Sequence, residues 1–449
     1  MLRTENLFRL TWPIYVQQMT QSFVLLADFW FFSRLSDTIA ATIGQLMPIV
    51  WMGAFVIPVF AGTGVAVATQ FMGAKRFDRV VPTYQTNLCL TVAMGAVFAL
   101  LMRLLASDVG PWMGMNARES AIGTAYLGTF AAYFVFVGIL VGYNAVLSSR
   151  GLTHWLMYSS AVVATLNVAL AATFVLAFHW GVRGIALASV ISVAAAAALS
   201  AWLVHGPLGI RFHRRNAWRD MAEVLPPVLR IGVANAMEPF SYAAQQTILS
   251  TLIVALGVKA MAANNYASRP QVFQIIFSVS LALAAQILMG HWTGAKRFAD
   301  VDRLYWTAIR RACFVAAVYA LTLWFFSDPV LGFFTHDPAI KHLGKTLLLI
   351  AAFYEPARAV NIITGNALKT VGDAHFPMIV AVVFIWGIVP VVLYIDHRWH
   401  LSLAGFWICF AADEIIRSLI NLWRWRTGRW KSMGIVHHLP VPVFGGGEV

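Results

Sequence analysis

A few carboxylates lie inside long apolar stretches of this chain, where a charge needs a partner or a function. Asp28 comes late in an apolar run that begins near residue 11 and also holds three glutamines, Gln17, Gln18 and Gln21. A carboxylate at membrane depth costs at least about 2.5–3.5 kcal/mol. Burial penalises its charged form, so Asp28 could take up and release a proton near neutral pH. The alternative is that its side chain reaches the membrane surface near Arg34.

The second half of the chain carries two further charged groups at helical spacing. Glu355 and Arg358 are three residues apart and can form an ion pair on one helix face. That pair serves either substrate binding or the structure alone. Asp413, Glu414 and Arg417 are spaced three and four apart, which favours an internal structural network.

Membrane-spanning helices must position these residues. The chain is 60% hydrophobic and 11% charged, whereas a soluble domain carries about 25% charged residues. Roughly twelve apolar stretches reach the about 20 residues that cross a bilayer, and backbone groups in lipid must pair within a helix. The expected spans are 11–33, 42–68, 83–105, 121–147, 157–178, 185–205, 226–256, 262–290, 304–327, 343–367, 377–395 and 402–424.

The chain also contains an internal duplication. The sequence Gly-Ala-Lys-Arg-Phe occurs at residues 73–77 and again at 294–298, an offset of 221 positions. The same offset relates Arg9 to Arg230, Gly151 to Gly372 and His154 to His375. We therefore expect an N-terminal six-helix lobe at 1–205, a cytoplasmic linker at 206–225, a C-terminal six-helix lobe at 226–431 and a cytoplasmic tail at 432–449.

The basic residues predict the orientation of the chain. Most lie in alternate loops and near the ends, at residues 3–9, 75–79, 150, 211–219, 296–303, 369 and 424–431. By the positive-inside rule both termini and both Gly-Ala-Lys-Arg-Phe loops are cytoplasmic. This distribution explains the net charge of +13 without nucleic-acid binding.

An even number of spans in each half gives both lobes the same orientation. Such lobes are related by a pseudo-two-fold axis along the membrane normal, with a shared cavity between them. This arrangement is typical of an alternating-access transporter, although a duplication can also be purely structural.

Several motifs are similar to those of the multidrug and toxic compound extrusion (MATE) family. In the first half they are Pro13, Asp28 and the stretch 62–66 leading to Gly73; in the second half they are Glu355 to Arg358, Asn361, Gly372, Asp373, Pro377, Asp413, Glu414, Arg417 and residues 424–426. The resemblance covers essentially the whole chain. It implies an all-α integral membrane protein with twelve transmembrane helices in two lobes. It also implies a secondary exporter of small amphiphilic or cationic compounds, driven by protons or sodium ions.

The resemblance also assigns roles to individual residues. Asn167 matches an asparagine that accompanies Asp28 in family members, so the two form the expected ion-coupling site; Ala171 replaces an acidic residue often found one turn further on. Glu238 lies at the repeat position of Gln17 and matches a glutamate that some members use for cations. Some members carry an aspartate about where Arg358 stands. The expected substrate- or cation-binding residues are therefore Gln17, Glu238, Tyr242, Glu355 and Arg358.

Two other classes of function are alternatives to an exporter. A flippase for lipid-linked precursors or polysaccharides belongs to the same fold superfamily as MATE proteins. Such a flippase would be expected to have several cationic side chains in its cavity, for which Arg358 and Arg417 are the candidates. The sequence shows no metal-ligand spacing around Cys89, Cys313 or Cys409 and no nucleotide-binding motif. We therefore expect no enzymatic activity, no metal and no cofactor. The expected protein is a monomer in a bacterial inner membrane.

Overall fold

The computed structural model describes residues 6–212 and 217–434 as an array of helices. Within α7 the side chains of Ala217, Pro239, Ala243 and Thr247 are not described. The described part of the chain contains no strand. Its long helices are α1 (Asn6–Leu35), α2 (Asp37–Gly73), α3 (Phe77–Trp112), α4 (Ala117–Ser149), α5 (His154–Ala172), α6 (Gly181–His205), α7 (Ala217–Ala255), α8 (Val258–Gly294), α9 (Phe298–Phe325), α11 (Pro338–Thr370), α12 (His375–Trp399) and α13 (Leu403–Arg426). Shorter elements are a π-helical segment at Thr173–Ala177, α10 (Ser327–Gly332) and a 3₁₀ turn at Arg429–Ser432.

These helices are the membrane-spanning elements that the apolar stretches predict. Within the described ranges, nine are long and apolar enough to cross a membrane. The other long helices, α1, α7 and α13, carry polar side chains that include Asp28, Glu238 and the charged group at residues 413–417. Large apolar side chains such as Phe55 and Phe314 are exposed, as expected for a protein in a lipid bilayer.

Side-chain caps begin several of the helices. Ser36 caps α2, Asn116 and Glu119 form a capping box on α4, and Ser402 caps α13. Asp337 accepts a hydrogen bond from the backbone N–H of Ala339 at the start of α11 and also pairs with Lys259. The Lys259 ammonium lowers the pKa of Asp337 below its ordinary value.

The internal duplication recurs in the backbone of the turns. Lys75 and Lys296 both have positive φ, at 59° and 57°, in the turns that follow α2 and α8. Gly151 and Gly372 share a positive φ, as do His179 and His400. Each pair is related by the offset of 221 residues, so the two halves repeat the turn geometry as well as the sequence.

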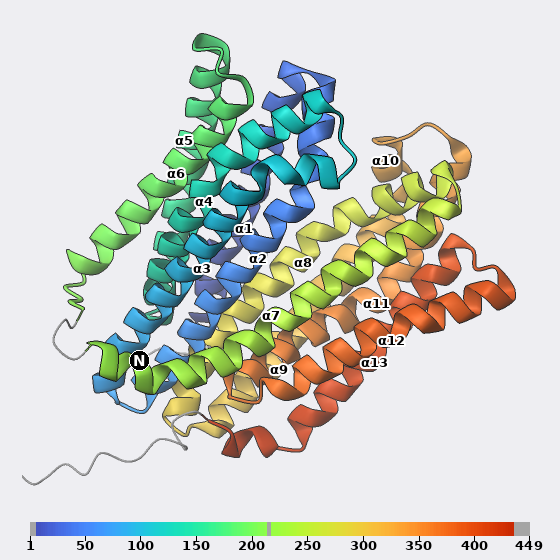
Figure 1. Ribbon diagram of the computed structural model, residues 1–449. Helices are drawn as coiled ribbons and strands as arrows, with labels where there is room; N and C mark the ends of the chain where they lie inside the picture. The colour runs from blue at the N-terminus through green and yellow to red at the C-terminus, as the bar shows by residue number, and fades with distance from the viewer. Residues whose placement is uncertain (1–5, 213–216, 435–449) are drawn as a thin grey trace, which may run out of the picture.

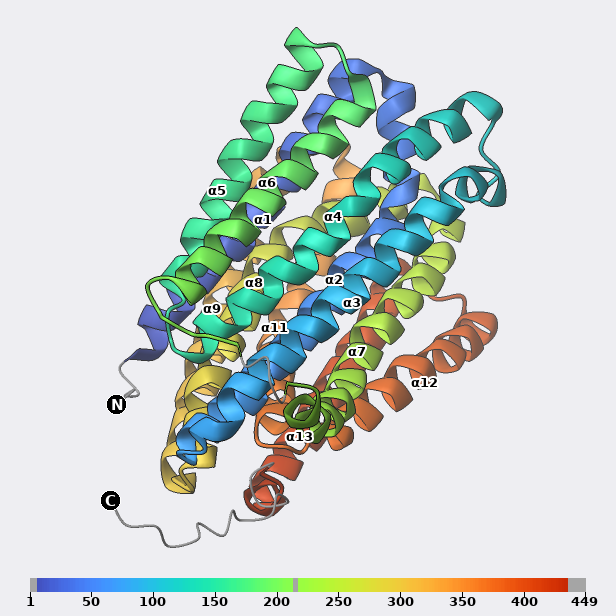
Figure 2. The same ribbon diagram turned by 60° about the vertical axis from the view of Figure 1, so that its left-hand side comes forward.

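The helices form two bundles, α1 to α6 and α7 to α13 (Figure 1). The bundles lie close together at the end that holds the turns after α2 and α8. Toward the other end, α5 and α6 diverge from α12 and α13 (Figures 1 and 2). The second halves of α2 and α8 run along the interface between the bundles. There Gln286 Nε2 donates to the carbonyl of Gly62 at 2.7 Å, and Asn235 Nδ2 donates to Thr63 Oγ1 at 3.1 Å.

Two features differ from the expected boundaries. Residues 217–225, expected within a linker, form the first turns of α7, where Glu223 forms an ion pair with Arg79. The remaining linker residues 213–216 and the tail residues 435–449 lie outside the described ranges. Most helices also extend beyond the expected spans, α3 to Phe77–Trp112 for example, because polar flanking residues continue the helix past its apolar stretch.

Candidate functional site

The N-terminal lobe places Asp28 on α1 opposite α5 and α6. Ser189 Oγ on α6 donates to Asp28 Oδ2 at 3.3 Å, and Asn167 Nδ2 on α5 donates to Ser189 Oγ at 3.0 Å. Asn167 is fully buried, Ser189 is 5% exposed, and Asn167 also interacts with the Asp28 carboxyl. Thus the structure brings Asp28 and Asn167 together, and adds Ser189 as the residue that links them.

Two oxygen atoms of this group are buried and have no hydrogen-bond partner among the described residues. They are Asp28 Oδ1 and Asn167 Oδ1. Buried polar oxygens are nearly always paired, so an unpaired couple in one cluster is a place where a proton or a cation would gain contacts. Arg34, the residue of the alternative reading, contacts the Trp30 ring at 5.0 Å from the ring centre.

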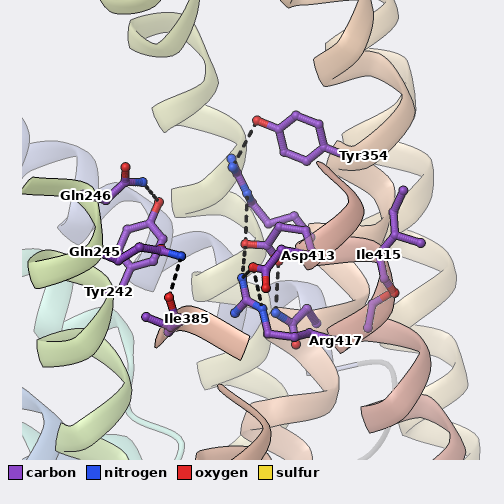
Figure 3. Close-up of polar contacts among 12 residues, drawn as sticks. Tyr242, Gln245, Gln246, Tyr354, Ile385, Asp413, Ile415 and Arg417 are labelled. Atoms are coloured by element: carbon purple, nitrogen blue, oxygen red, sulfur yellow. Dashed lines mark hydrogen bonds and ion pairs between the residues drawn. The ribbon is translucent and has the colours of Figure 1, made fainter. Parts of the chain in front are cut away.

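The C-terminal lobe joins its charged residues into one network between α11 and α13. Arg358 Nη1 donates to Glu355 Oε1 at 2.6 Å, and Arg358 Nε lies 3.8 Å from Glu414 Oε1. Arg417 Nη2 contacts Glu414 Oε1 at 3.0 Å and Asp413 Oδ2 at 2.6 Å. Figure 3 shows the Asp413–Arg417 contact at the centre of this group.

All five side chains of this network are 10% exposed or less. The buried group therefore balances three carboxylates against two guanidinium groups. Breaking one contact would leave an uncompensated charge in a medium of low polarity, which is far costlier than the contact itself contributes.

Glu238 on α7 has a partner that the sequence analysis did not assign. Lys369 Nζ, in the last turn of α11, donates to Glu238 Oε2 at 2.6 Å. Lys369, expected in the loop after this span, lies inside α11, which continues to Thr370. The carboxylate expected to bind cations is already paired with an ammonium group.

A cavity of about 250 Å³ lies in the C-terminal lobe among α7, α8, α11 and α13. Its wall includes Tyr242, Gln246 and Arg358. Gln246 Nε2 donates to Tyr242 Oη at 2.6 Å, and Arg358 Nη2 donates to Tyr354 Oη at 3.1 Å (Figure 3). Of the expected substrate-binding residues, Tyr242 and Arg358 line this cavity, whereas Gln17, Glu238 and Glu355 do not.

Two similar lobes of long, mostly apolar helices define a multi-pass membrane protein. A family model described as MatE matches residues 13–173 and again residues 231–395, one block in each lobe. The chain therefore belongs to the MatE family, whose members are transporters and include multidrug resistance proteins.

Relatives of full length support this membership. The chain is 26% identical over 449 residues to the "Uncharacterized transporter YisQ" of Bacillus subtilis, covering 96% of each protein. It is 21% identical to the "Probable multidrug resistance protein NorM" of Thermotoga maritima, covering 96% of this chain and 94% of the relative.

Solved structures show the same fold. A crystal structure of a MATE protein in the bent conformation superposes with a TM-score of 0.87 at 20% identity, covering 95% of this chain and 96% of the other. An outward-facing MATE transporter of the MOP superfamily superposes with a TM-score of 0.84 at 19% identity, covering 95% and 96%. These matches establish twelve transmembrane helices in two lobes.

Proposed function

We propose that the protein is a secondary active exporter, an antiporter that expels small amphiphilic or cationic compounds in exchange for protons or sodium ions. The observation that carries this proposal is the Asp28 carboxyl, held by Ser189 beside Asn167, with one oxygen left unpaired among the described residues. Family membership supports export, and this group supplies a means of coupling it to an ion gradient.

Coupling requires an ion that binds one conformation better than the other. Asp28 follows Pro13 on α1, and α1 packs against both α5 in its own lobe and α8 in the other lobe. A neutral Asp28 allows α1 to pack against its apolar neighbours, whereas a charged Asp28 needs water or a cation. Ion binding at Asp28 therefore changes the position of α1, and this movement opens or closes the path of substrates to the cavity between the lobes.

The chemistry of the group favours a proton as the coupling ion. The cluster of Asp28, Ser189 and Asn167 contains a single carboxylate, which one proton neutralises. Ala171 stands where family members often carry a second acidic residue. The two unpaired oxygens of Asp28 and Asn167 keep sodium as the alternative, because Na⁺ binds oxygen ligands.

We further propose a monomer in a bacterial inner membrane, with both termini and both Gly-Ala-Lys-Arg-Phe turns on the cytoplasmic side. The basic residues at 75–79 and 296–303 support this orientation. Small molecules and the lipid bilayer are its partners, and no cofactor other than the coupling ion is needed.

Everted membrane vesicles test the proposal directly. Uptake of ethidium into vesicles that contain the protein should require an imposed ion gradient. Collapse of the proton gradient should abolish uptake if the ion is H⁺, and removal of sodium should abolish it if the ion is Na⁺. Uptake that persists under both treatments would contradict an ion-coupled antiporter.

A flippase remains the alternative within the superfamily. It would bind an anionic lipid carrier, which requires cationic groups that are free to face the cavity. Arg358 lines the cavity but contacts Glu355 and Glu414, and Arg417 is 3% exposed and paired with two carboxylates. These contacts favour the exporter.

A further inference from the structure

The cavity of the C-terminal lobe has a wall chemistry that restricts its ligands. Arg358 is the one charged side chain among the described residues of the wall, and none of these is a carboxylate. Its lining consists of Tyr242, Gln246, Leu249, Ser250, Ile253, Asn264, Ser268, Gln271, Val272, Ile275, Tyr354, Arg358, Phe406, Trp407 and Phe410. A cation in this cavity would meet the Arg358 guanidinium and no counter-charge in the wall.

A ligand with a full negative charge is also poorly matched to this cavity. Glu355 and Glu414 contact the Arg358 guanidinium at 2.6 and 3.8 Å without lining the cavity. They already compensate its charge, so an anionic ligand would gain the attraction of Arg358 but also the repulsion of both carboxylates. Arg358 is therefore best used as a hydrogen-bond donor to a neutral acceptor such as a carbonyl.

The rest of the polar wall consists of neutral amides and hydroxyls. The Tyr242 hydroxyl accepts from Gln246, which leaves its own hydrogen free to donate. Asn264 uses its side-chain oxygen to accept from Trp407 Nε1 at 2.9 Å, which leaves its amide nitrogen as a donor. Such groups select a ligand through hydrogen bonds rather than through charge.

Aromatic and aliphatic side chains form the apolar part of the wall. The hydrogen bond from Trp407 to Asn264 fixes the Trp407 ring, and the rings of Phe406 and Phe410 lie on the same helix. The Trp407 ring, held in this way, offers a flat surface for stacking on a planar ligand. A cavity of about 250 Å³ suits a compound of one or two rings.

We propose that this cavity binds an uncharged molecule of one or two rings that carries carbonyl or hydroxyl groups. The proposal rests on the exporter function, for which it names a substrate class, and it places that class in the C-terminal lobe. Charged amphiphiles would then use other surfaces between the lobes.

Three fluorescent coumarins that differ in charge test the proposal by binding to the purified, full-length protein in lipid nanodiscs. They are 7-diethylamino-4-methylcoumarin, the same ring system with a 3-carboxylate, and the same ring system with a trimethylammonium group. Fluorescence anisotropy should give the lowest Kd for the neutral compound, by about tenfold over either charged one. Tighter binding of the cation or the anion, or binding of none of the three, overturns the proposal.

A single substitution should reverse this preference. Gln246→Glu keeps the size of the side chain and adds a carboxylate to the wall, so the cationic coumarin should bind about tenfold more tightly and the neutral one more weakly. Gln45→Glu adds the same charge at an exposed position of α2 in the other lobe and should change neither. No change of preference in Gln246→Glu would show that the coumarins bind elsewhere.

Transport separates failure of this inference from failure of the proposed function. Gradient-driven ethidium export by a protein that prefers the cationic coumarin would support the exporter function and contradict the neutral-ligand site. The opposite result is binding of the neutral coumarin that weakens in Gln246→Glu, with no export of any compound. It would support the neutral-ligand site and contradict the exporter function.

Discussion

Gly73 and Gly294 form a symmetric close approach between the two lobes. A Cβ on Gly73 would overlap the carbonyl oxygen of His291, and a Cβ on Gly294 would overlap the carbonyl oxygen of Gln70. Gln70 and His291 are themselves related by the offset of 221 residues, so the pseudo-two-fold axis passes through this crossing. The lobes can meet here because neither residue has a side chain.

The first prediction concerns this crossing. Gly73→Ala or Gly294→Ala should prevent the lobes from closing at this end, because each adds a methyl group where backbone already lies. The cost of such overpacking is about 1–3 kcal/mol. We expect ethidium export to fall at least about tenfold in either variant.

The control for this prediction is another glycine of α2. Gly62→Ala adds a methyl group with no atom within 4 Å and should export normally. Equal loss of export in Gly62→Ala and Gly73→Ala would mean that the close approach is not the cause.

The internal repeat could be predicted from the sequence because the same residues recur in the matching turns, and those turns then adopt the same backbone geometry. Lys75 and Lys296 occupy matching left-handed positions, and the motif around each is the same. Glu355 with Arg358, and Asp413 with Arg417, could be anticipated as contacts because helical spacing places them on one face. Local geometry determines both features.

The contacts that join distant helices could not be predicted in this way. Ser189 contacts Asp28 across 161 positions, and Lys369 contacts Glu238 across 131. The side chain of a serine inside a membrane helix most often donates to a carbonyl of the same helix. A lysine close to the end of an apolar stretch usually lies in the following loop, so neither residue signals a contact with a distant helix. The cavity combines residues of four helices, whose relative rotation depends on packing and not on any local pattern.

The second prediction concerns Ser189. Ser189→Ala removes the donor to Asp28 and the acceptor of Asn167, which leaves buried polar groups unpaired at about 1–3 kcal/mol. We expect normal binding of substrate and about tenfold slower gradient-driven export in vesicles. Ser192→Ala is the control, because Ser192 bonds only to carbonyls of its own helix. Wild-type export in Ser189→Ala would remove Ser189 from the coupling group.

The third prediction concerns the buried pair of the C-terminal lobe. Arg358→Ala should reduce the yield of folded protein more than the double variant Glu355→Gln with Arg358→Gln. Removing one partner of a buried pair costs about 3–5 kcal/mol, because the other charge stays uncompensated. Size-exclusion chromatography of a fluorescent fusion measures the yield. If both variants lose the same amount, the two residues act independently.

The fourth prediction concerns Glu238. Lys369→Met should release the Glu238 carboxylate and tighten binding of the cationic coumarin by about tenfold. The double variant Glu238→Gln with Lys369→Met should bind this cation as weakly as the unmodified protein or more weakly. Unchanged cation binding in Lys369→Met would indicate that Glu238 does not contact substrate.

Asp28→Asn is the most direct test of the coupling site. It keeps the size and hydrogen bonding of the side chain but removes its ability to titrate. Asp37→Asn is the control, because Asp37 is exposed at the start of α2. Ethidium accumulation should be measured in everted vesicles between pH 6 and 8, with substrate binding and expression measured in parallel. The account predicts normal expression and binding in Asp28→Asn, with gradient-driven accumulation lost, and wild-type behaviour in Asp37→Asn. Accumulation against a gradient by Asp28→Asn, with the pH dependence of the unmodified protein, would contradict it.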